Sequence, residues 1–522
     1  MKNDIMIPSN FKSAMNSPQS KFWYEAMKDE FKTIKDRHVW DLVEKPQNIK
    51  ILGSRWVFNL KKNANGEVER YKVRLVAQGF HQIKGLNYEE VFNPVVNFSV
   101  IRLFFALLVG FLKWTNCQID VKNAYLYAPL KEKIYMYQPK GFVDSEKPNH
   151  VCLLRKALYG LHQSGRQWFF ELHGVLESLG FSKFKWANCI YHYKKNVILL
   201  LYVDDMVIFS KYNHLTEEII KSLSSKFDLK VLGKTKKLLG VEFEEIKENL
   251  YIHQTNYIND VYSRFKKYNP PISSLPISKG ILLSKEQCPA TNSELEEMKK
   301  IPYRSLIGCI SFLACRTRPD VMYAVNTLSQ FQSQPGKYHW NVALRLLGYI
   351  YATKNLKLNL SNVSNISLKC FSDASFAANR DDRCSVGGYI LFLDAIPVSW
   401  STKKQKTVAL SSMEAEFLSL TDASKELYWT KNILLELNKL QNCYNNECTL
   451  YSDNQSAIYF SNSPIENSKT KHINVKYHFV RNLIFKNVFK LKFIRSKENI
   501  SDIFTKPPTK IELKSFVDKI FI

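Results

Sequence analysis

The hydrophobic pattern of the chain centres on residues 197–209, VILLLYVDDMVIF, where two apolar runs flank a pair of aspartates. Short apolar runs around a turn signal predict a strand, a tight turn and a second strand, with Asp204 and Asp205 at or beside the turn. Aspartate is common in turns, so a lone pair is most simply structural. Two like charges in a partly dry site nevertheless repel each other, and a divalent cation would compensate them.

A β-hairpin is predicted upstream of this segment. Residues 55–60 alternate in polarity, Asn65-Gly66 is a turn signal that tolerates positive φ, and residues 69–77 form the return strand. One face of the return strand carries three cations: Arg70, Lys72 and Arg74. They form either a solvated surface or a binding site for a triphosphate. The second interpretation is possible because Arg and Lys donors bind phosphate.

A third carboxylate follows a buried helix. Residues 94–110 are typical of a capped, largely buried helix, and Asp120 ends the apolar strand after it, where a third metal ligand would lie. Residues 153–170 combine a Gly-Leu-x-Gln turn with an aromatic and cationic helix, which suits contact with a base pair and phosphates.

The last third of the chain predicts a separate α/β domain with its own acidic residues. Two strands end at Asp373 and Asp453, and a helix that begins at Ser411, with Glu414 in a capping box, carries Glu416. Ser501 is predicted to cap the last helix, with Asp502 in its first turn. Acids at helix starts are ordinary, but strand-end aspartates and a helical glutamate can converge on two Mg²⁺ ions for phosphodiester hydrolysis.

Composition and charge point to a polyanionic partner. The 522 residues are 45% hydrophobic and 13% aromatic, as expected of a folded chain, and 74 Lys and Arg against 48 Asp and Glu give a net charge of +26. Such an excess favours nucleic acid, although charge alone also fits a merely soluble basic protein. Ten cysteines without a CxxC pair, no apolar signal core and no apolar run near 20 residues predict a soluble, intracellular protein in a reducing compartment.

Several strings, in their order along the chain, closely resemble the reverse transcriptase of copia-type LTR retrotransposons: RWVFNLKKNANGEVERYKVRLVAQGF, YEEVFNPVVNFSVIR, QIDVKNAYL, IYMYQPKGF, LRKALYGLHQSGRQW and LYVDD. The later contexts SDASF, SSMEAEF, YSDNQSA and NISDIFTK resemble the ribonuclease H domain at the end of copia-type Pol proteins. The resemblance runs from about Trp23 to the C-terminus. It implies an α+β and α/β multidomain fold: a right-hand polymerase of fingers, palm and thumb, a connection region and a ribonuclease H-like domain.

The resemblance also implies roles for individual residues. Two Mg²⁺ or Mn²⁺ ions per site would be held by Asp120, Asp204 and Asp205 in the polymerase and by Asp373, Glu416, Asp453 and Asp502 in the nuclease, where the motif favours Glu416 over Glu414. Substrate would meet the fingers cations Lys72 and Arg74, the aromatic gate Tyr125 and the base-pair residue Gln163, with Leu239-Gly240 in a primer-contacting hairpin. One departure is His162, where the family usually has Lys.

We expect the following domains: a polar lead-in over 1–19, the reverse transcriptase over 20–268, a linker and helical connection region over 269–365, the ribonuclease H-like domain over 366–510 and a C-terminal tail over 511–522. The chain carries neither the zinc module or acidic triad of an integrase nor the Asp-Thr/Ser-Gly of an aspartic protease, so it resembles the C-terminal part of a polyprotein. Implied partners are an RNA template, a DNA primer, RNA/DNA hybrid, dNTPs and other Pol or Gag products, without a membrane. The implied location is the cytoplasm, in virus-like particles, or the nucleus.

Three alternatives stay open from the sequence. A degenerate or domesticated copy would bind nucleic acid without catalysis, and Tyr127-Ala128-Pro129, where the family often has Asn-Gly, keeps this hypothesis alive. A chain with one working site is the second. A zinc site from Cys443, Cys448, His472 and His478 is the third, but their spacing is poor, and core cysteines and surface histidines are favoured.

Overall fold

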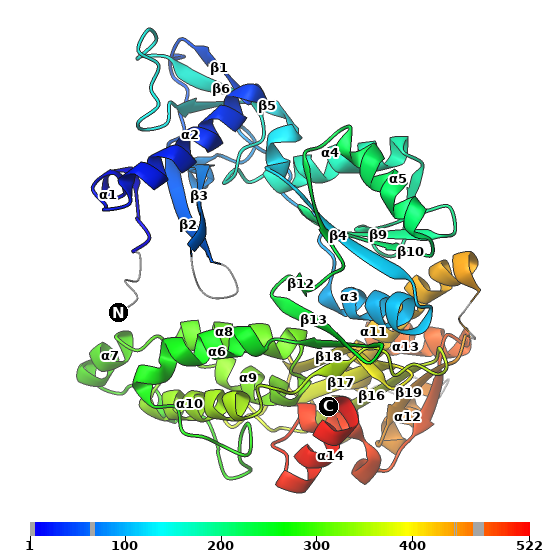
Figure 1. Ribbon diagram of the computed structural model, residues 1–522. Helices are drawn as coiled ribbons and strands as arrows, with labels where there is room; N and C mark the ends of the chain where they lie inside the picture. Colours follow the sequence, from blue (N-terminus) through cyan, green and yellow to red (C-terminus); the bar gives the residue numbers. More distant parts are fainter. Residues whose placement is uncertain (1–5, 63–67, 443, 445, 463–473) are drawn as a thin grey trace. The chain divides into compact units, whose positions relative to one another are not determined.

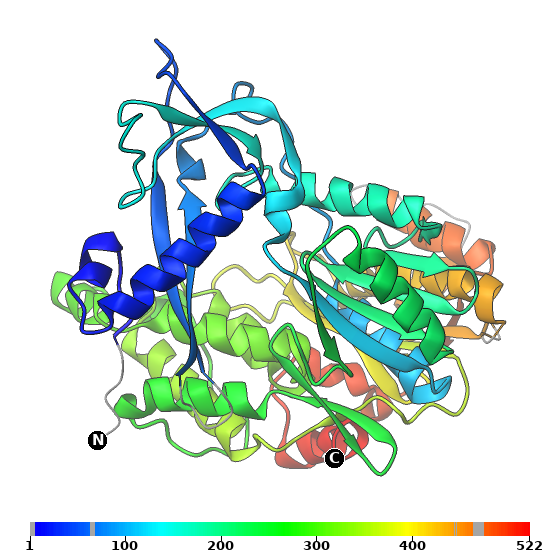
Figure 2. The same ribbon diagram turned by 45° about the horizontal axis from the view of Figure 1, so that its top comes forward.

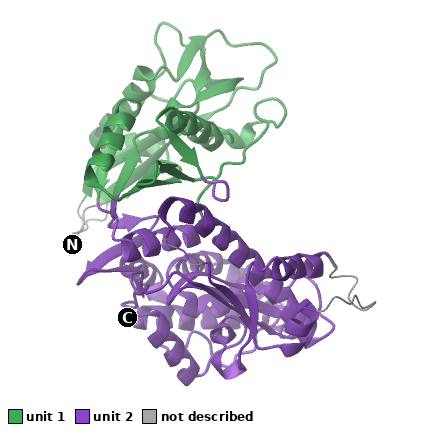
Figure 3. Ribbon diagram, turned by 90° about the vertical axis from the view of Figure 1, so that its right-hand side faces the viewer, with its two compact units in different colours: residues 1–96, 117–183, 188–233 green, residues 97–116, 184–187, 234–522 purple. Residues whose placement is uncertain are grey.

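The computed structural model describes residues 6–62, 68–442, 444, 446–462 and 474–522. The chain divides into two compact units (Figure 3): unit 1 contains residues 1–96, 117–183 and 188–233, and unit 2 contains residues 97–116, 184–187 and 234–522. The finer domain limits expected from the sequence stay predictions.

Unit 1 contains a six-stranded sheet with the order β11-β4-β10-β9-β8-β7, of which β4, β9 and β10 are labelled in Figure 1. Its strands are β4 (Thr115–Val121), β7 (Phe181–Lys183), β8 (Ile190–Tyr193), β9 (Val197–Tyr202), β10 (Asp205–Ser210) and β11 (Leu229–Gly233). Asp205 pairs with Tyr202, so only Val203 and Asp204 form the loop of the β9-β10 hairpin. The predicted strand, turn and strand are confirmed, and helices α4 (Ser164–Ser178) and α5 (Asn213–Ser224) pack against this sheet.

The remainder of unit 1 includes the hairpin of β2 (Ser54–Lys62) and β3 (Val68–Ala77). Helix α2 (Ser20–Asp36) lies across this hairpin in both views (Figures 1 and 2) and buries Trp23, whose ring meets Phe58 and Tyr71 edge-on. The predicted Asn65-Gly66 turn lies outside the described residues. The other elements are β1 (Trp40–Val43), β5 (Pro129–Tyr137) and β6 (Val151–Lys156) in the sheet β1-β6-β5, and the short helices η1 (Gly79–His81) and η3 (Ala124–Tyr127).

The expected polar lead-in over 1–19 is wrong in part, because it contains a helix that joins the core. Helix α1 (Phe11–Met15) has a capping box in which the side chain of Asn10 accepts the backbone N–H of Ser13. Ala14 is fully buried. The apolar residues of this segment therefore find a packing surface that their local sequence does not reveal.

Unit 2 begins with helical elements and a small sheet. A capped helix, α3 (Phe98–Phe104), continues into the π-helical η2 (Phe105–Phe111), as the buried helix was predicted. The four-stranded sheet has the order β12-β13-β14-β15: β12 (Lys237–Leu238), β13 (Val241–Ile246), β14 (Asn249–His253) and β15 (Leu358–Asn359). The helices are α6 (Thr255–Phe265), η4 (Lys266–Tyr268), η5 (Lys285–Gln287), α7 (Asn292–Lys299), α8 (Tyr303–Arg316), η6 (Pro319–Val321), α9 (Met322–Ser329) and α10 (Lys337–Ala352).

A five-stranded mixed sheet, β18-β17-β16-β19-β20, organises the rest of unit 2. Strands β16 (Leu368–Ser375), β17 (Val386–Leu393) and β18 (Ile396–Lys404) form an antiparallel meander. Helix α11 (Ser412–Gln441) then crosses over, so that β19 (Cys448–Ser452) and β20 (Lys490–Phe493) run parallel to β16. This mixed sheet confirms the α/β class expected for a ribonuclease H-like domain. Helices α12 (Gln455–Asn462), α13 (Asn474–Phe485), η8 (Ser496–Glu498), η9 (Ile500–Phe504) and α14 (Lys510–Ile520) complete it.

Three local expectations in this region are corrected. Residues 511–522 are not a loose tail, because they form most of α14 and pack Phe516 against Phe504. Ser501 is not a cap of that helix, since Asn499 caps the short helix η9 and Thr509 caps α14. Ser411 caps α11 as predicted, but the carboxylate of Glu414 accepts the N–H of Leu410. No helix in the described part of the chain is both long and apolar enough to span a membrane.

Two helical glycines of unit 2 should respond oppositely to alanine. A Cβ at Gly348, in α10, would lie 1.8 Å from the carbonyl oxygen of Pro271, whereas one at Gly308, in α8, meets nothing within 4 Å. We expect Gly348→Ala to lower the free energy of unfolding by about 1–3 kcal/mol. Gly308→Ala should raise it by about 0.5–1 kcal/mol, because glycine loses more backbone entropy on folding. Urea unfolding of both variants measures this, and equal effects would contradict the packing described.

Candidate active sites

The first site lies in unit 1 and is organised by the β9-β10 turn. Val203 has φ 57°, a left-handed conformation that costs a β-branched residue about 1–3 kcal/mol. Two hydrogen bonds hold the turn: Trp168 Nε1 donates to the Val203 carbonyl at 2.7 Å, and the N–H of Val121 donates to the Asp204 carbonyl at 3.0 Å. The surrounding sheet therefore maintains a strained turn that fixes Asp204.

The first site combines carboxylates and cations around one cavity of about 270 Å³. Asp120, from β4, and Asp204 line it, and β4 is the sheet neighbour of β10. Hairpin β2-β3 also contributes to the lining, with the predicted phosphate-binding cations Lys72 and Arg74 and with Lys61 and Arg70. The structure thus brings two of the three predicted carboxylates and both predicted fingers cations to one space.

The charges of this cavity are incompletely balanced. Burial and the charges of Asp204 and Asp120 raise the pKa of Asp205 to about 6. Burial and the charge of Asp120 also raise the pKa of Asp204, while burial and Arg74 lower the pKa of Lys72. Arg74 Nε is buried without a hydrogen-bond partner among the described residues. An anion beside Arg74 and a cation beside the aspartates would both be stabilised here.

The remaining predicted residues of the first site lie around the cavity rather than in it. Asp205 accepts a hydrogen bond from Gln118 Nε2 at 3.4 Å and is not among the lining residues. Tyr125 packs against Tyr159, which does line the cavity, with ring centroids 4.8 Å apart. Gln163 is 1% exposed and donates to the Asn87 carbonyl at 2.8 Å. Its predicted contact with a base pair stays a prediction.

Sequence reasoning missed Arg37 and Tyr127. The guanidinium of Arg37, which follows α2, donates to the carbonyls of Lys122 (3.1 Å) and Asn123 (2.9 Å), and so fixes the segment after Asp120. Arg37 also lies over the ring of Tyr127, 4.0 Å from its centroid. A lone arginine 85 residues away along the sequence gives no signal of this contact.

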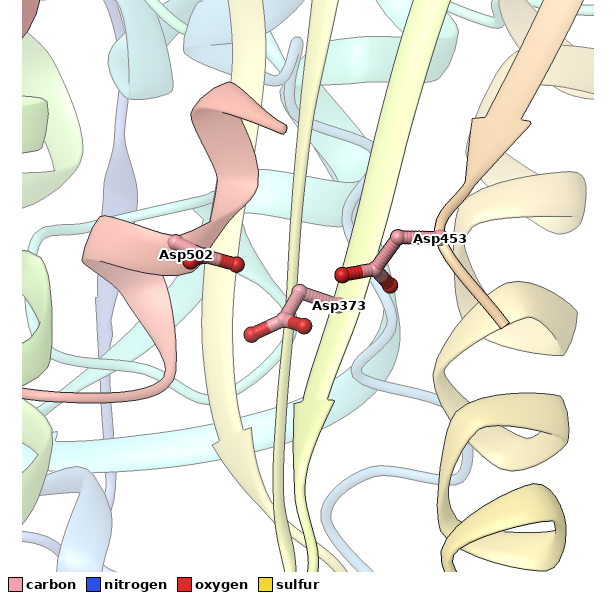
Figure 4. A group of neighbouring side chains, drawn as sticks. All are labelled: Asp373, Asp453 and Asp502. Carbon is pink, nitrogen blue, oxygen red and sulfur yellow. The ribbon is translucent and has the colours of Figure 1, made fainter. Parts of the chain in front are cut away.

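The second site lies in unit 2, at one edge of the five-stranded sheet. Phe371 of β16 is in register with Tyr451 of β19, so Asp373 and Asp453, each two residues further on, lie side by side. Asp502 reaches the same point from η9 (Figure 4). One carboxylate oxygen from each of the three aspartates lies within 4.8 Å of the others. Among the residues that the structure describes, no other group of three or more acidic, His or Cys side chains is as compact.

Burial and mutual repulsion dominate the electrostatics of the second site. Burial and the charge of Asp502 raise the pKa of Asp373 to about 7, and burial and the charges of Asp373 and Asp453 raise the pKa of Glu416 to about 9. Burial also raises the pKa of Asp502, which pairs with Lys506 at 2.6 Å. The hydroxyl of Thr505 donates to Asp373. The four predicted acids thus share one crowded, partly dry space.

These residues fit a divalent metal ion. Glu416 Oε2 and Asp502 Oδ1 are buried and have no hydrogen-bond partner among the described residues. Hard oxygen donors of this kind are the ligands that Mg²⁺ and Mn²⁺ prefer. The zinc alternative gains no support: Cys448 is buried in β19, and Cys443 and His472 lie outside the described residues.

Comparisons with known proteins agree with this geometry. The family model described as reverse transcriptase (RNA-dependent DNA polymerase) matches residues 37–279. The Pol polyprotein of tobacco transposon TNT 1-94 is 37% identical over 98% of this chain and 39% of its own length. That of Arabidopsis thaliana transposon RE1 is 35% identical over 98% of this chain and 34% of its own length. The chain belongs to the copia-type retrotransposon Pol family.

Copia-type relatives also set the limits of the comparison. This copia-type chain spans less than two fifths of the length of these two relatives. The putative transposon Ty5-1 protein of Saccharomyces cerevisiae is 29% identical over 59% of this chain and its own full length. The solved foamy viral protease-reverse transcriptase in complex with dsDNA is a remote neighbour, with a TM-score of 0.42 and 11% identity over 91% of this chain and 83% of that one.

The crowded acids of this copia-type chain predict a pH-dependent stability. Because the folded pKa values of Asp373 and Glu416 are raised, their protonated forms stabilise the fold fully below about pH 4, and this stability is lost as the pH rises through 7 and 9. The melting temperature of metal-free protein should therefore fall between about pH 5 and pH 9. Millimolar MgCl₂ should restore it most at the alkaline end.

Two variants test the origin of this dependence by calorimetry. Asp373→Asn should flatten the pH dependence and remove most of the response to MgCl₂. Asp518→Asn, at an exposed position of α14, should leave both unchanged. If Asp373→Asn behaved like Asp518→Asn, carboxylate crowding at the second site would not be the cause.

Proposed function

We propose that this chain is an RNA-directed DNA polymerase and that its second site hydrolyses the RNA strand of an RNA/DNA hybrid. The carrying observation for the polymerase is the unit 1 cavity, where Asp120 and Asp204 face Lys72 and Arg74 within a segment that matches the reverse transcriptase model. The compact trio Asp373, Asp453 and Asp502 supports the nuclease. The relatives' longer polyproteins carry further segments, so their whole activity is not assigned to this chain.

In the polymerase, different residues of the cavity would bind different parts of the substrate. Lys72 and Arg74 would bind the triphosphate of a dNTP, since both donors face the cavity and Arg74 Nε lacks a partner. Asp120, Asp204 and Asp205 would hold two Mg²⁺ ions, which lower the pKa of the primer 3′-hydroxyl and neutralise charge on the phosphate when bound. Tyr125, beside the lining residue Tyr159, is placed to gate the sugar.

In the nuclease, the four acids would form one metal-binding site. Asp373, Asp453 and Asp502 would hold two ions, which supply an activated water and stabilise the leaving oxygen when bound. Glu416 completes the set, because its buried Oε2 has no partner among the described residues. The net charge of +26 supports a sequence-independent affinity for duplexes that weakens steeply with salt. Activity in the cytoplasm, in virus-like particles, or in the nucleus fits this proposal.

Asparagine in each site separates the two activities. Asp204→Asn should lower dNTP-dependent primer extension on an RNA template by at least about a hundredfold and leave cleavage of a preformed hybrid unchanged, because it removes one ligand charge from one site only. Asp453→Asn should do the reverse. Primer extension and release of labelled RNA fragments measure the two activities.

The outcome separates the enzyme from its alternatives. Extension that survives Asp204→Asn, or cleavage that survives Asp453→Asn, would remove that site from the proposal. Duplex binding that falls with salt while the wild-type chain neither extends nor cleaves would instead favour the degenerate binding protein.

Trp168→Phe tests the support of the β9-β10 turn. The variant keeps an aromatic ring but removes the donor to the part-buried Val203 carbonyl, a loss worth about 1–2 kcal/mol. Primer extension should fall about tenfold, while hybrid cleavage should not change. Trp186→Phe, at a 36% exposed tryptophan, is the matched control. Equal extension by both variants would show that the indole donor does not position Asp204.

A further inference from the structure

Unit 2 has a cavity of its own, of about 420 Å³, between the start of β17, the end of β18 and helix α11. Asp422 is the single acid in its lining. Five lysines also line it: Lys403, Lys404, Lys406, Lys425 and Lys476. We call this cavity the lysine pocket. None of its lining residues belongs to the four predicted acids of the nuclease.

The lysine pocket carries an excess of positive charge, although Lys403 also interacts with the Glu426 carboxylate. Lys404 pairs with Asp382 at 2.5 Å and Lys425 pairs with Asp422 at 3.4 Å. Lys403, Lys406 and Lys476 are exposed, and no ion pair joins them to a described residue. Like charges around one hollow repel each other unless an anion lies between them. Lysine is a point-charge ligand of phosphate, which identifies the chemical class of the ligand.

The segment that bears these lysines is fixed to the helix that carries Glu416. The backbone N–H of Gln405 donates to the Ser385 carbonyl at 2.8 Å, and its Nε2 donates to the Ala415 carbonyl at 2.8 Å. Ala415 immediately precedes Glu416. The positions of Lys404 and Lys406, on either side of Gln405, are therefore tied to the nuclease carboxylates through one side chain.

The pocket and the carboxylates share one edge of the sheet. Gly388, which lines the pocket, is in register with Asp373 on the neighbouring strand, and neighbouring strands lie about 4.8 Å apart. Ser419, also in the lining, donates to the Asp373 carbonyl at 2.7 Å and lies about one helical turn beyond Glu416. A nucleic-acid strand carries a phosphate for every ~3.4 Å of helix axis. A strand cleaved at the carboxylates would thus place a nearby phosphate at the pocket.

We propose that the lysine pocket binds a backbone phosphate of the RNA/DNA hybrid, within a few nucleotides of the cleaved bond, and so sets where the hybrid is cut. The proposal rests on the nuclease proposed above. It predicts that Lys403 and Lys406 act in substrate binding and position, and that they take no part in the hydrolytic step.

The test uses the full chain and a preformed hybrid with labelled RNA. Lys403→Gln/Lys406→Gln should raise KM for cleavage about tenfold, leave kcat within about twofold and make the salt dependence of kcat/KM shallower by about one to two in log–log slope. The cut positions should also spread. The control Lys369→Gln/Lys439→Gln removes the same charge at the start of β16 and near the end of α11, and should leave all three quantities unchanged. Lys403→Arg/Lys406→Arg should restore KM if charge is the cause.

Neutral methylphosphonates at single positions of the hybrid locate the phosphate. For the wild-type chain, one position near the cut should raise KM, and the same substitution should have no further effect on Lys403→Gln/Lys406→Gln. If no position matters to the wild type, or if the lysine variant matches its control, the proposal is wrong. Competition by inorganic phosphate without any dependence on hybrid phosphates would likewise overturn it, in favour of a small-anion site.

Binding measured without metal separates this proposal from the nuclease itself. The lysine variant should bind the hybrid about tenfold more weakly than the control, whether or not the wild-type chain cleaves RNA. A chain that does not cleave but shows this difference would lose the proposed nuclease and keep the phosphate site. A chain that cleaves without this difference would lose the phosphate site alone.

Discussion

Repulsion between buried carboxylates is the constraint around which both sites are built. Burial, and then this repulsion, raise the pKa of Asp204 and Asp205 in unit 1 and of Asp373 and Glu416 in unit 2. A fold that only had to be stable would not gather acids in this way, since each costs desolvation and repulsion. The arrangement becomes favourable once divalent cations lie between the oxygens. The carboxylate oxygens that destabilise the metal-free fold are therefore the same atoms that would bind the ions.

The protein maintains these acids through rigid neighbours rather than through local preference. Val203 stays at φ 57° because Trp168 and Val121 hold the turn on both sides. Asp373 stays in place because the register of β16 with β17 and β19 fixes its position, and the hydroxyl of Thr505 contacts it. Hydrogen bonds of the surrounding sheet thus hold the strained turn and the charged side chains of these sites in place.

Positive charge accompanies the carboxylates at each acidic site. Lys72 and Arg74 line one cavity together with Asp120 and Asp204, and the lysine pocket adjoins the edge of the sheet that carries Asp373. A phosphodiester substrate needs both: cations to hold its phosphates and carboxylates to hold the metal ions that act on one of them. The large net charge is therefore organised, in part, around the two sites.

The sequence by itself determined the strands with an aspartate at or near one end, the cationic face of hairpin β2-β3, the cap at Ser411 and the family, because these depend on residues close together in the chain. Only the tertiary structure decided that α1 and α14 join the packed core, that Asn499 rather than Ser501 caps the segment of Asp502, and that Arg37 holds the residues after Asp120. It also showed that Gln163 is buried and that the lysines at the end of β18 line a cavity beside Asp373. Such features depend on contacts between residues far apart in sequence, which neither periodicity nor spacing can reveal.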